Sequence, residues 1–121
     1  MLSFFQKKIG GFRNAIKGVA IAWQEHNFRF QVAWGIATLF LAWLFDFSAI
    51  EFTIVVLMSG LVLAAETVNT ALEELCDKFQ PTHDPHIARI KDLGAAAVFI
   101  ASLAAIVVGL ALFIPHLILF F

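Results

Sequence analysis

The fold is decided by residues 93–121, LGAAAVFIASLAAIVVGLALFIPHLILFF, a stretch that contains no Lys, Arg, Asp or Glu. A helix needs about 20 predominantly apolar residues to cross the hydrocarbon core of a bilayer. The stretch exceeds that length, so we expect a membrane-spanning helix over 92–117. Small residues recur along it at every fourth position, which lets another helix of this chain or of a second copy approach closely. They are Ala97, Ala101, Ala105 and Gly109.

Two further apolar stretches precede this one. Residues 30–45 and 52–65 carry no formal charge, and each reaches span length when its flanks are included. We therefore expect a first span over 28–46 and a second over 50–77, the latter with a cytoplasmic extension. The chain is 61% hydrophobic, with 14 Phe and no Tyr, which is more than the interior of a small soluble domain can hide. The sequence predicts an all-α membrane protein that forms one domain over 1–121.

The N-terminal segment 4–27 has a different pattern, in which apolar and basic residues alternate at helical spacing. Its apolar residues are Phe4, Phe5, Ile9, Phe12, Ile16, Val19 and Trp23, and its basic residues are Lys7, Lys8, Arg13 and Lys17. This pattern is typical of an amphipathic helix that lies in the membrane interface. The alternative is an ordinary helix packed on a protein core, but the sequence offers little soluble core for it to cover.

The basic residues predict the orientation in the membrane. All eight lie on one side of the predicted bilayer: Lys7, Lys8, Arg13, Lys17, Arg29, Lys78, Arg89 and Lys91. The connection between the first two spans contains Asp46 and Glu51 but no basic residue. Because Lys and Arg are retained on the cytoplasmic side, we expect the N-terminus and the polar connection 79–90 in the cytoplasm and the C-terminus outside.

The segment ETVNTALEELCD at 66–77 places polar residues at the end of the second span. At about 100° per residue, four of them fall within a stripe about 80° wide and about 16 Å long. They are Glu66, Asn69, Glu73 and Asp77. Glu66 directly follows LVLAA, at or below the membrane surface, where a carboxylate costs on the order of a few kcal/mol unless it faces a cavity, a partner or an ion. The stripe predicts an acidic groove that opens to the cytoplasm.

Other charged residues are expected at the level of this groove. Glu25 precedes the first span, and Lys91 and Asp92 begin the third. Carboxylates can hold Mg²⁺ and its nucleotide, a lysine neutralises phosphate charge, and a further carboxylate can accept a proton from an attacking hydroxyl. The residues alone leave phosphoryl transfer and cation translocation open, although the lack of charge from residue 93 onward argues against a pore. A structural alternative is that Glu73 and Asp77 form the solvated end of a helix.

Three motifs resemble the bacterial diacylglycerol kinase and undecaprenol kinase family of small homotrimeric membrane kinases. ETVNTALEELCD at 66–77 and RIKDLGAAAV at 89–98 resemble the family signature, and EHNFR at 25–29 matches its Glu-x-x-Phe-Arg element. Their order and spacing agree across nearly the whole chain. The resemblance implies an ATP-dependent lipid kinase in the inner (cytoplasmic) membrane of a bacterium, which works as a homotrimer with active sites between protomers.

The resemblance also implies a role for each site residue. Glu66 would be the general base supported by Asn69, and Glu25 and Glu73 would bind the Mg²⁺ that accompanies ATP. The implied nucleotide contacts are Glu25, Glu73, His83, Asp84, Lys91 and Asp92. The implied lipid contacts are Phe28, Arg29, Glu66 and Ala95.

Short stretches bear on the identity of the lipid. ALFIPHL at 111–117, NFRFQ at 27–31 and Ala95 look closer to the undecaprenol type, whereas the diacylglycerol type tends to have serine at the last position. The sequence therefore slightly favours undecaprenol. ATP, a lipid alcohol and the bilayer are the expected partners, and no nucleic acid is expected. Two alternatives remain open, namely a small transporter or channel subunit and a non-catalytic member of the family.

Overall fold

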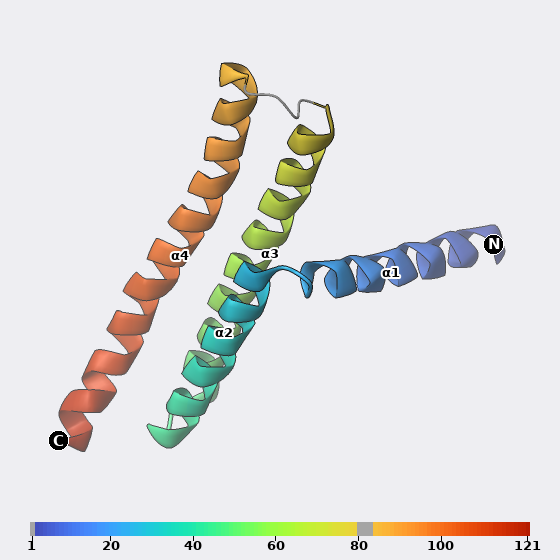
Figure 1. Cartoon of the computed structure of the whole chain (residues 1–121). Helices are drawn as coiled ribbons and strands as arrows, with labels where there is room; N and C mark the ends of the chain where they lie inside the picture. Colours follow the sequence, from blue (N-terminus) through green and yellow to red (C-terminus); the bar gives the residue numbers. More distant parts are fainter. Residues whose placement is uncertain (1, 80–83) are drawn as a thin grey trace.

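The computed structural model describes residues 2–79 and 84–121, and every regular element within them is an α-helix. Four helices follow one another along the chain (Figure 1). They are α1 (Leu2–Ala22), α2 (His26–Leu44), α3 (Ala49–Phe79) and α4 (Pro85–Phe120). The expected all-α fold is therefore confirmed.

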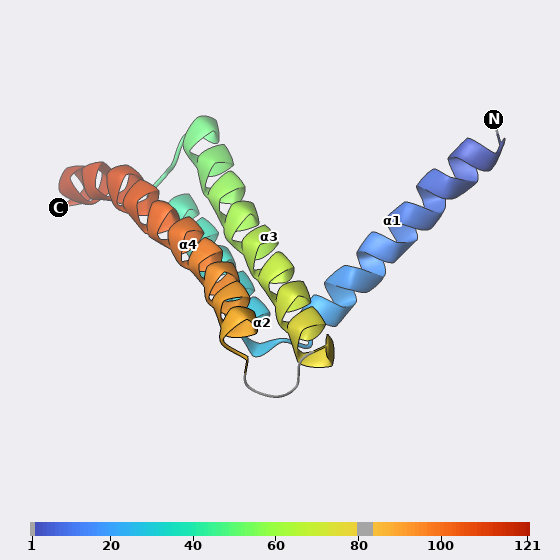
Figure 2. The ribbon, with the colours of Figure 1, turned by 90° about the horizontal axis from the view of Figure 1, so that it is seen from above.

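Helices α2, α3 and α4 form an elongated bundle from which α1 projects (Figures 1 and 2). α3 is central to the bundle, because it packs against both α4 and α2. Large apolar side chains cover the outside of the bundle; Phe99 and Ile118, for example, are 68% and 71% exposed. An apolar exterior of this extent marks a surface that faces lipid or other protein. By length and composition, α3 and α4 are the two helices in the described ranges that could cross a membrane.

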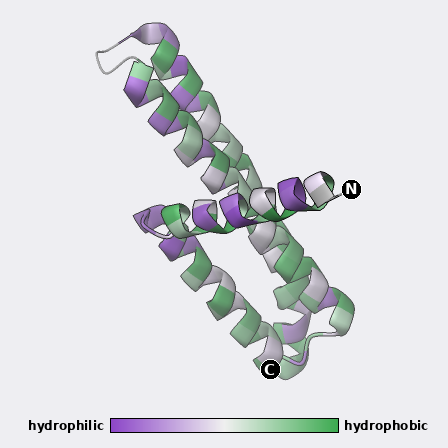
Figure 3. Cartoon of the chain, turned by 90° about the vertical axis from the view of Figure 1, so that its right-hand side faces the viewer, coloured by the Kyte–Doolittle hydropathy of each residue, from purple (hydrophilic) through white to green (hydrophobic). Residues whose placement is uncertain are grey.

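α1 carries both hydrophilic and hydrophobic residues along its whole length (Figure 3). Its side chains Phe4, Phe12 and Ile16 are each more than half exposed, at 60%, 68% and 55%. The rest of the described chain therefore leaves the apolar side of α1 uncovered. A helix with one basic and one apolar side that stands clear of the bundle has the geometry of an interfacial helix.

α1 ends at Ala22, five residues before the end expected from the sequence at residue 27. The next residues form a tight turn, in which the amide N–H of Glu25 donates to the carbonyl of Ala22 at 3.0 Å. Glu25 itself has an extended backbone, with φ −82° and ψ 130°. The turn is held by packing, since Ala22 and Phe28 are both buried and the ring of Trp23 meets that of Phe28 edge-on at 6.4 Å. The apolar pattern continues past the end of α1 because the apolar side chains of this region pack over the turn between α1 and α2 instead of extending the helix.

At the opposite end of the bundle, the α2–α3 connection packs against α4. Ser48 and Glu51 form a reciprocal cap, in which the Ser48 N–H donates to Glu51 Oε1 at 3.1 Å and the Glu51 N–H donates to Ser48 Oγ at 3.2 Å. Glu51 Oε2 also lies 2.7 Å from His116 Nε2 of α4, and the His116 ring stacks on buried Phe47 at 4.5 Å. We call these four residues the Glu51 corner. They join the start of α3 to the end of α4.

The start of α4 is set by a polar cap. Asp84 Oδ1 accepts hydrogen bonds from the backbone N–H groups of His86 at 2.8 Å and Ile87 at 3.3 Å, and Pro85 occupies the first turn. An aspartate cap followed by proline is a strong helix start. α4 therefore begins at Pro85, seven residues before the apolar span expected from residue 92, and its first two turns carry the polar residues that precede that span.

Candidate active site

Glu66 and Asn69 of α3 are the centre of the site. Their exposed fractions are 5% and 7%, and they are the two buried polar side chains in the described part of the chain. Burying a carboxylate is costly unless hydrogen bonds or a bound group compensate. Their burial shows that the stripe predicted along α3 turns its first two members toward the neighbouring helices rather than toward solvent.

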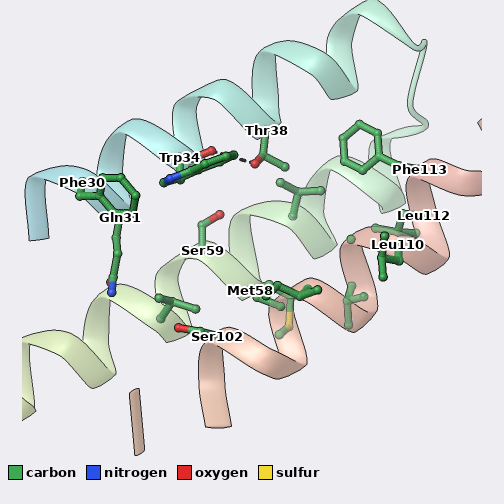
Figure 4. A pocket seen from close by; sticks show the side chains of 17 residues that line it. Phe30, Gln31, Trp34, Thr38, Met58, Ser59, Ser102, Leu110, Leu112 and Phe113 are labelled. Carbon is green, nitrogen blue, oxygen red and sulfur yellow. Dashed lines mark hydrogen bonds between the residues drawn. The ribbon is translucent and has the colours of Figure 1, made fainter. Parts of the chain in front are cut away.

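Gln31 of α2 reaches across to Glu66. Its side chain extends from α2 toward α3 (Figure 4), and its Nε2 donates to Glu66 Oε2 at 3.3 Å. Its Oε1 is buried and has no hydrogen-bond partner among the described residues. An unpaired buried acceptor costs about 1–3 kcal/mol of folding free energy. The position of this oxygen is therefore unfavourable for stability. Sequence reasoning missed Gln31, although a glutamine inside an otherwise apolar span was a signal that could have found it.

Asn69 connects Glu73 on one side to α4 on the other. Its Nδ2 donates to Glu73 Oε1 at 3.2 Å, one helical turn further along α3. Its Oδ1 is buried without a described partner and lies directly against Gly94 of α4, where an added Cβ would overlap it. Gly94 thus allows α4 to close over Asn69. Nothing in the one-dimensional pattern distinguished this glycine from the others, because the contact exists only once α3 and α4 are packed.

Lys91 and Asp77 form an ion pair above Asn69 and Glu73. Lys91 Nζ lies 2.5 Å from Asp77 Oδ1, and the two side chains are 39% and 66% exposed. The hydrogen bond to Asp77 raises the pKa of Lys91 above its usual value of 10.5, against a smaller lowering by desolvation. Lys91 therefore carries its full charge at neutral pH, on the first turns of α4 and next to the polar stripe of α3. That is a suitable position for a cation that neutralises phosphate.

The remaining residue of the predicted metal pair, Glu25, lies in the turn before α2 and is exposed. Gln31 lies opposite Glu66, and α2 runs antiparallel to α3 (Figure 1). From Gln31 back to His26, where α2 begins beside Glu25, the helix rises about 8 Å, and from Glu66 forward to Glu73 it rises about 10.5 Å, so both carboxylates lie toward the same end of the bundle. Within residues 2–79 and 84–121, no three His, Cys, Asp or Glu side chains form a group able to hold a metal ion.

This donor set nevertheless fits one kind of metal site. Mg²⁺ is usually held by one or two carboxylates together with water and substrate phosphates, and not by a complete protein cage. Glu73 keeps one orientation through its hydrogen bond from Asn69, and Glu25 has no side-chain role in capping α2. The two carboxylates are compatible with a metal that arrives with its nucleotide.

The other predicted contacts occupy varied positions. Asp84 is engaged as the cap of α4, and His83 lies outside the described residues. Asp92 and Ala95 are exposed on α4, next to Lys91 and Gly94. Arg29 is exposed on α2. Phe28 is buried between α1 and α2 and packs as a core residue. The expected lipid contacts of both residues stay predictions.

An apolar cavity extends from the site into the bundle. It has a volume of about 630 Å³ and is lined by residues of α2, α3 and α4, as Figure 4 shows. Ligand cavities for small molecules lie in the range of about 300–1,000 Å³ and are mostly apolar with a few placed polar groups. Gln31 is at one end of the lining, and Phe113, part of the packing beside the Glu51 corner, is at the other. The cavity therefore leads from the middle of the bundle to the residue that holds Glu66.

Comparison with known proteins identifies the family. Residues 13–113 match the family model described as prokaryotic diacylglycerol kinase. The chain belongs to this family. It is therefore an ATP-dependent lipid kinase and a membrane protein. The recognition of the family from residues 25–29, 66–77 and 89–98 is confirmed.

Relatives within the prokaryotic diacylglycerol kinase family carry two different names. The chain is 34% identical over 93 residues to an undecaprenol kinase of Bacillus subtilis (strain 168), covering 77% of this chain and 76% of the relative. It is 38% identical over 108 residues to a diacylglycerol kinase of Synechocystis sp. (strain ATCC 27184 / PCC 6803 / Kazusa), covering 88% of this chain and 62% of the relative. It is 33% identical over 102 residues to a diacylglycerol kinase of Escherichia coli (strain K12), covering 83% of each chain.

Proposed function

We propose that this chain transfers the γ-phosphate of ATP to the hydroxyl of a lipid alcohol, with Glu66 as the general base. The observation that carries the proposal is the position of Glu66. Its carboxylate is buried, and within the described residues the side chain that hydrogen-bonds it is Gln31, which lies at one end of the lining of an apolar cavity. A carboxylate in this position can meet a hydroxyl whose hydrocarbon tail stays among the helices.

The proposed reaction follows from the groups around Glu66. The lipid oxygen attacks the γ-phosphorus as its proton passes to Glu66, and the bond from phosphorus to the β–γ bridging oxygen breaks with its electron pair leaving on ADP. Lys91 neutralises charge on the phosphates, and Asn69 holds Glu73 in place. Glu25 and Glu73 would hold Mg²⁺, which when bound neutralises developing phosphate charge and aligns the nucleotide. Positioning and electrostatics supply most of the rate enhancement in reactions of this type.

The proposed arrangement in the membrane has three spans and an interfacial α1. α3 and α4 meet the length and hydropathy expected of spans, and we take α2 as the third, because it is apolar, packs against α3 and runs antiparallel to it (Figure 1). All Lys and Arg then lie on the cytoplasmic side of the inner membrane, with the C-terminus outside. The exposed apolar surface of the bundle and the uncovered side of α1 support a homotrimer, in which neighbouring protomers complete each site.

Undecaprenol is our preferred substrate over diacylglycerol. The segments NFRFQ at 27–31 and ALFIPHL at 111–117 and the residue Ala95 favour it, and the undecaprenol kinase of Bacillus subtilis is among the relatives. The test is to incubate the purified protein with [γ-³²P]ATP and Mg²⁺ and to offer undecaprenol and diacylglycerol in separate reactions. We expect label in the organic extract from undecaprenol at the higher kcat/KM. A higher value with diacylglycerol would reverse the substrate assignment, and no label with either would contradict the proposed transfer.

A further inference from the structure

Gln31 is the residue in the described chain that both lines the cavity and contacts the carboxylate of Glu66. Other polar residues of the cavity wall do not share this position: Thr38, for example, donates to the carbonyl of Trp34 on its own helix at 2.7 Å. Figure 4 shows Gln31 at the end of the cavity, with its amide directed toward α3. A group that occupies this end of the cavity therefore lies beside the residue that holds Glu66.

The hydrogen bond from Gln31 distinguishes the two oxygens of Glu66. Nε2 donates to Oε2, and no described side chain donates to Oε1. A carboxylate held by one oxygen cannot rotate freely, so the other oxygen keeps a fixed direction.

The unpaired atoms of the site are all acceptors. Gln31 Oε1, in the side chain that contacts Glu66, and Asn69 Oδ1, which faces Gly94, are buried and have no partner among the described residues. The amide of Gln31 cannot be reversed without placing its carbonyl against the carboxylate. Buried acceptors are satisfied only by a group that brings a hydrogen, such as an alcohol O–H, and they reject an ether or ester oxygen at the same place.

We propose that Gln31 is a positioning residue that orients Glu66 toward the cavity and restricts the group meeting it to a hydrogen-bond donor. The proposal rests on the proposed function of Glu66 as the base. Gln31 itself exchanges no proton: the hydroxyl proton passes to Glu66, the lipid oxygen bonds to the γ-phosphorus, and ADP leaves with the electron pair of the broken bond. Gln31 acts by holding Glu66 Oε2 throughout.

The test uses full-length protein in lipid vesicles and compares Gln31→Leu and Gln31→Glu with wild type and Glu66→Gln. For Gln31→Leu we expect kcat to fall by about 10- to 100-fold with less than about a twofold change in KM for ATP, because misplacement of a reacting group by about 1 Å costs on the order of 100-fold. Gln31→Glu replaces the amide donor by a second carboxyl group of the same shape, so kcat should fall by a similar factor while KM for ATP is kept.

Controls separate this proposal from the assignment of Glu66. Thr53→Val removes a hydrogen bond from Thr53 Oγ1 to the carbonyl of Ala49 on the exposed surface of α3, far from the site, and should keep the wild-type kcat and KM. If Glu66→Gln is inactive but Gln31→Leu keeps the wild-type kcat, the role of Gln31 is overturned while the base survives. If Glu66→Gln turns over normally, both assignments are overturned. Gln31→Glu conserves the shape of the side chain and carries the test alone if the leucine variant fails to fold.

Discussion

Helix α3 carries a partly or fully buried carboxylate near each end of its apolar segment, and the two differ in their hydrogen-bond partners. Glu51 has a partner for both oxygens: Oε1 accepts from Ser48, and Oε2 pairs with His116, whose ring stacks on Phe47. Glu66 is more deeply buried, yet a single amide from Gln31 reaches it, and acceptors beside it are left unpaired.

The difference separates a structural site from a chemical one. A carboxylate that has a protein partner on each oxygen stabilises the fold and needs no ligand to compensate its burial. A buried carboxylate with incomplete hydrogen bonding is maintained at a cost that a bound substrate can offset. Changes at the Glu66 end should therefore alter turnover, whereas changes at the Glu51 corner should alter stability.

The largest effect should come from Glu66→Gln. The variant keeps the size of the side chain but cannot accept a proton, so we expect kcat to fall by about 10²- to 10⁴-fold, with KM for ATP within about twofold of wild type. Steady-state kinetics with a saturating lipid alcohol measure the change. Thermal unfolding should show no loss of stability. Wild-type turnover in this variant would remove Glu66 from the role of base.

The next effect should come from Gly94→Ala. The added methyl group would overlap Asn69 Oδ1, so Asn69 must move together with its hydrogen bond to Glu73. We expect kcat to fall by on the order of 10- to 100-fold, as for a displacement of about 1 Å. Gly60→Ala is the matched control, because nothing lies within 4 Å of its added Cβ, and it should keep full activity. Equal losses in the two variants would show that the close approach of α4 to Asn69 has no special importance.

A smaller effect, on stability, should come from His116→Ala. The change removes the partner of Glu51 Oε2 and the ring stacked on Phe47. We expect the Tm in detergent to fall by on the order of 5 °C, with kcat at 25 °C within about twofold of wild type. Differential scanning fluorimetry and the kinase assay test the two halves of this prediction. A large loss of kcat without loss of Tm would assign His116 a role in catalysis. It would contradict the distinction between the Glu66 end of α3 and the Glu51 corner.

The smallest effect should come from Asp77→Asn, which removes the partner of Lys91. The folded protein raises the pKa of Lys91, so the pair stabilises the fold fully below the unfolded value of about 10.5, and this contribution is lost as pH rises through the raised value. The Tm difference between wild type and variant should therefore be constant from pH 7 to 9 and should shrink only in strong alkali. It should be small throughout, because both side chains are substantially exposed. A difference that changes between pH 7 and 9 would contradict this account.

The sequence by itself determined the helical fold, the apolar surface and the family. Residues 93–121 could only be a long apolar helix, and the motifs at 25–29, 66–77 and 89–98 are local patterns that need no packing to be read. It also marked Glu66 and Asn69, because a carboxylate that follows an uninterrupted apolar run must face something other than lipid. Roles assigned to the exposed residues Glu25, Asp92 and Ala95 remain predictions.

Only the tertiary structure decided which atoms meet. The amide of Gln31 on Glu66, the overlap that Gly94 avoids with Asn69, and the pairing of His116 with Glu51 join residues 35, 25 and 65 positions apart. The early end of α1 was likewise set by the packing of Ala22 and Phe28 at its corner. Periodicity reports which side of a helix a residue occupies, but the partner on the facing helix depends on the register between helices, and that register is fixed by packing.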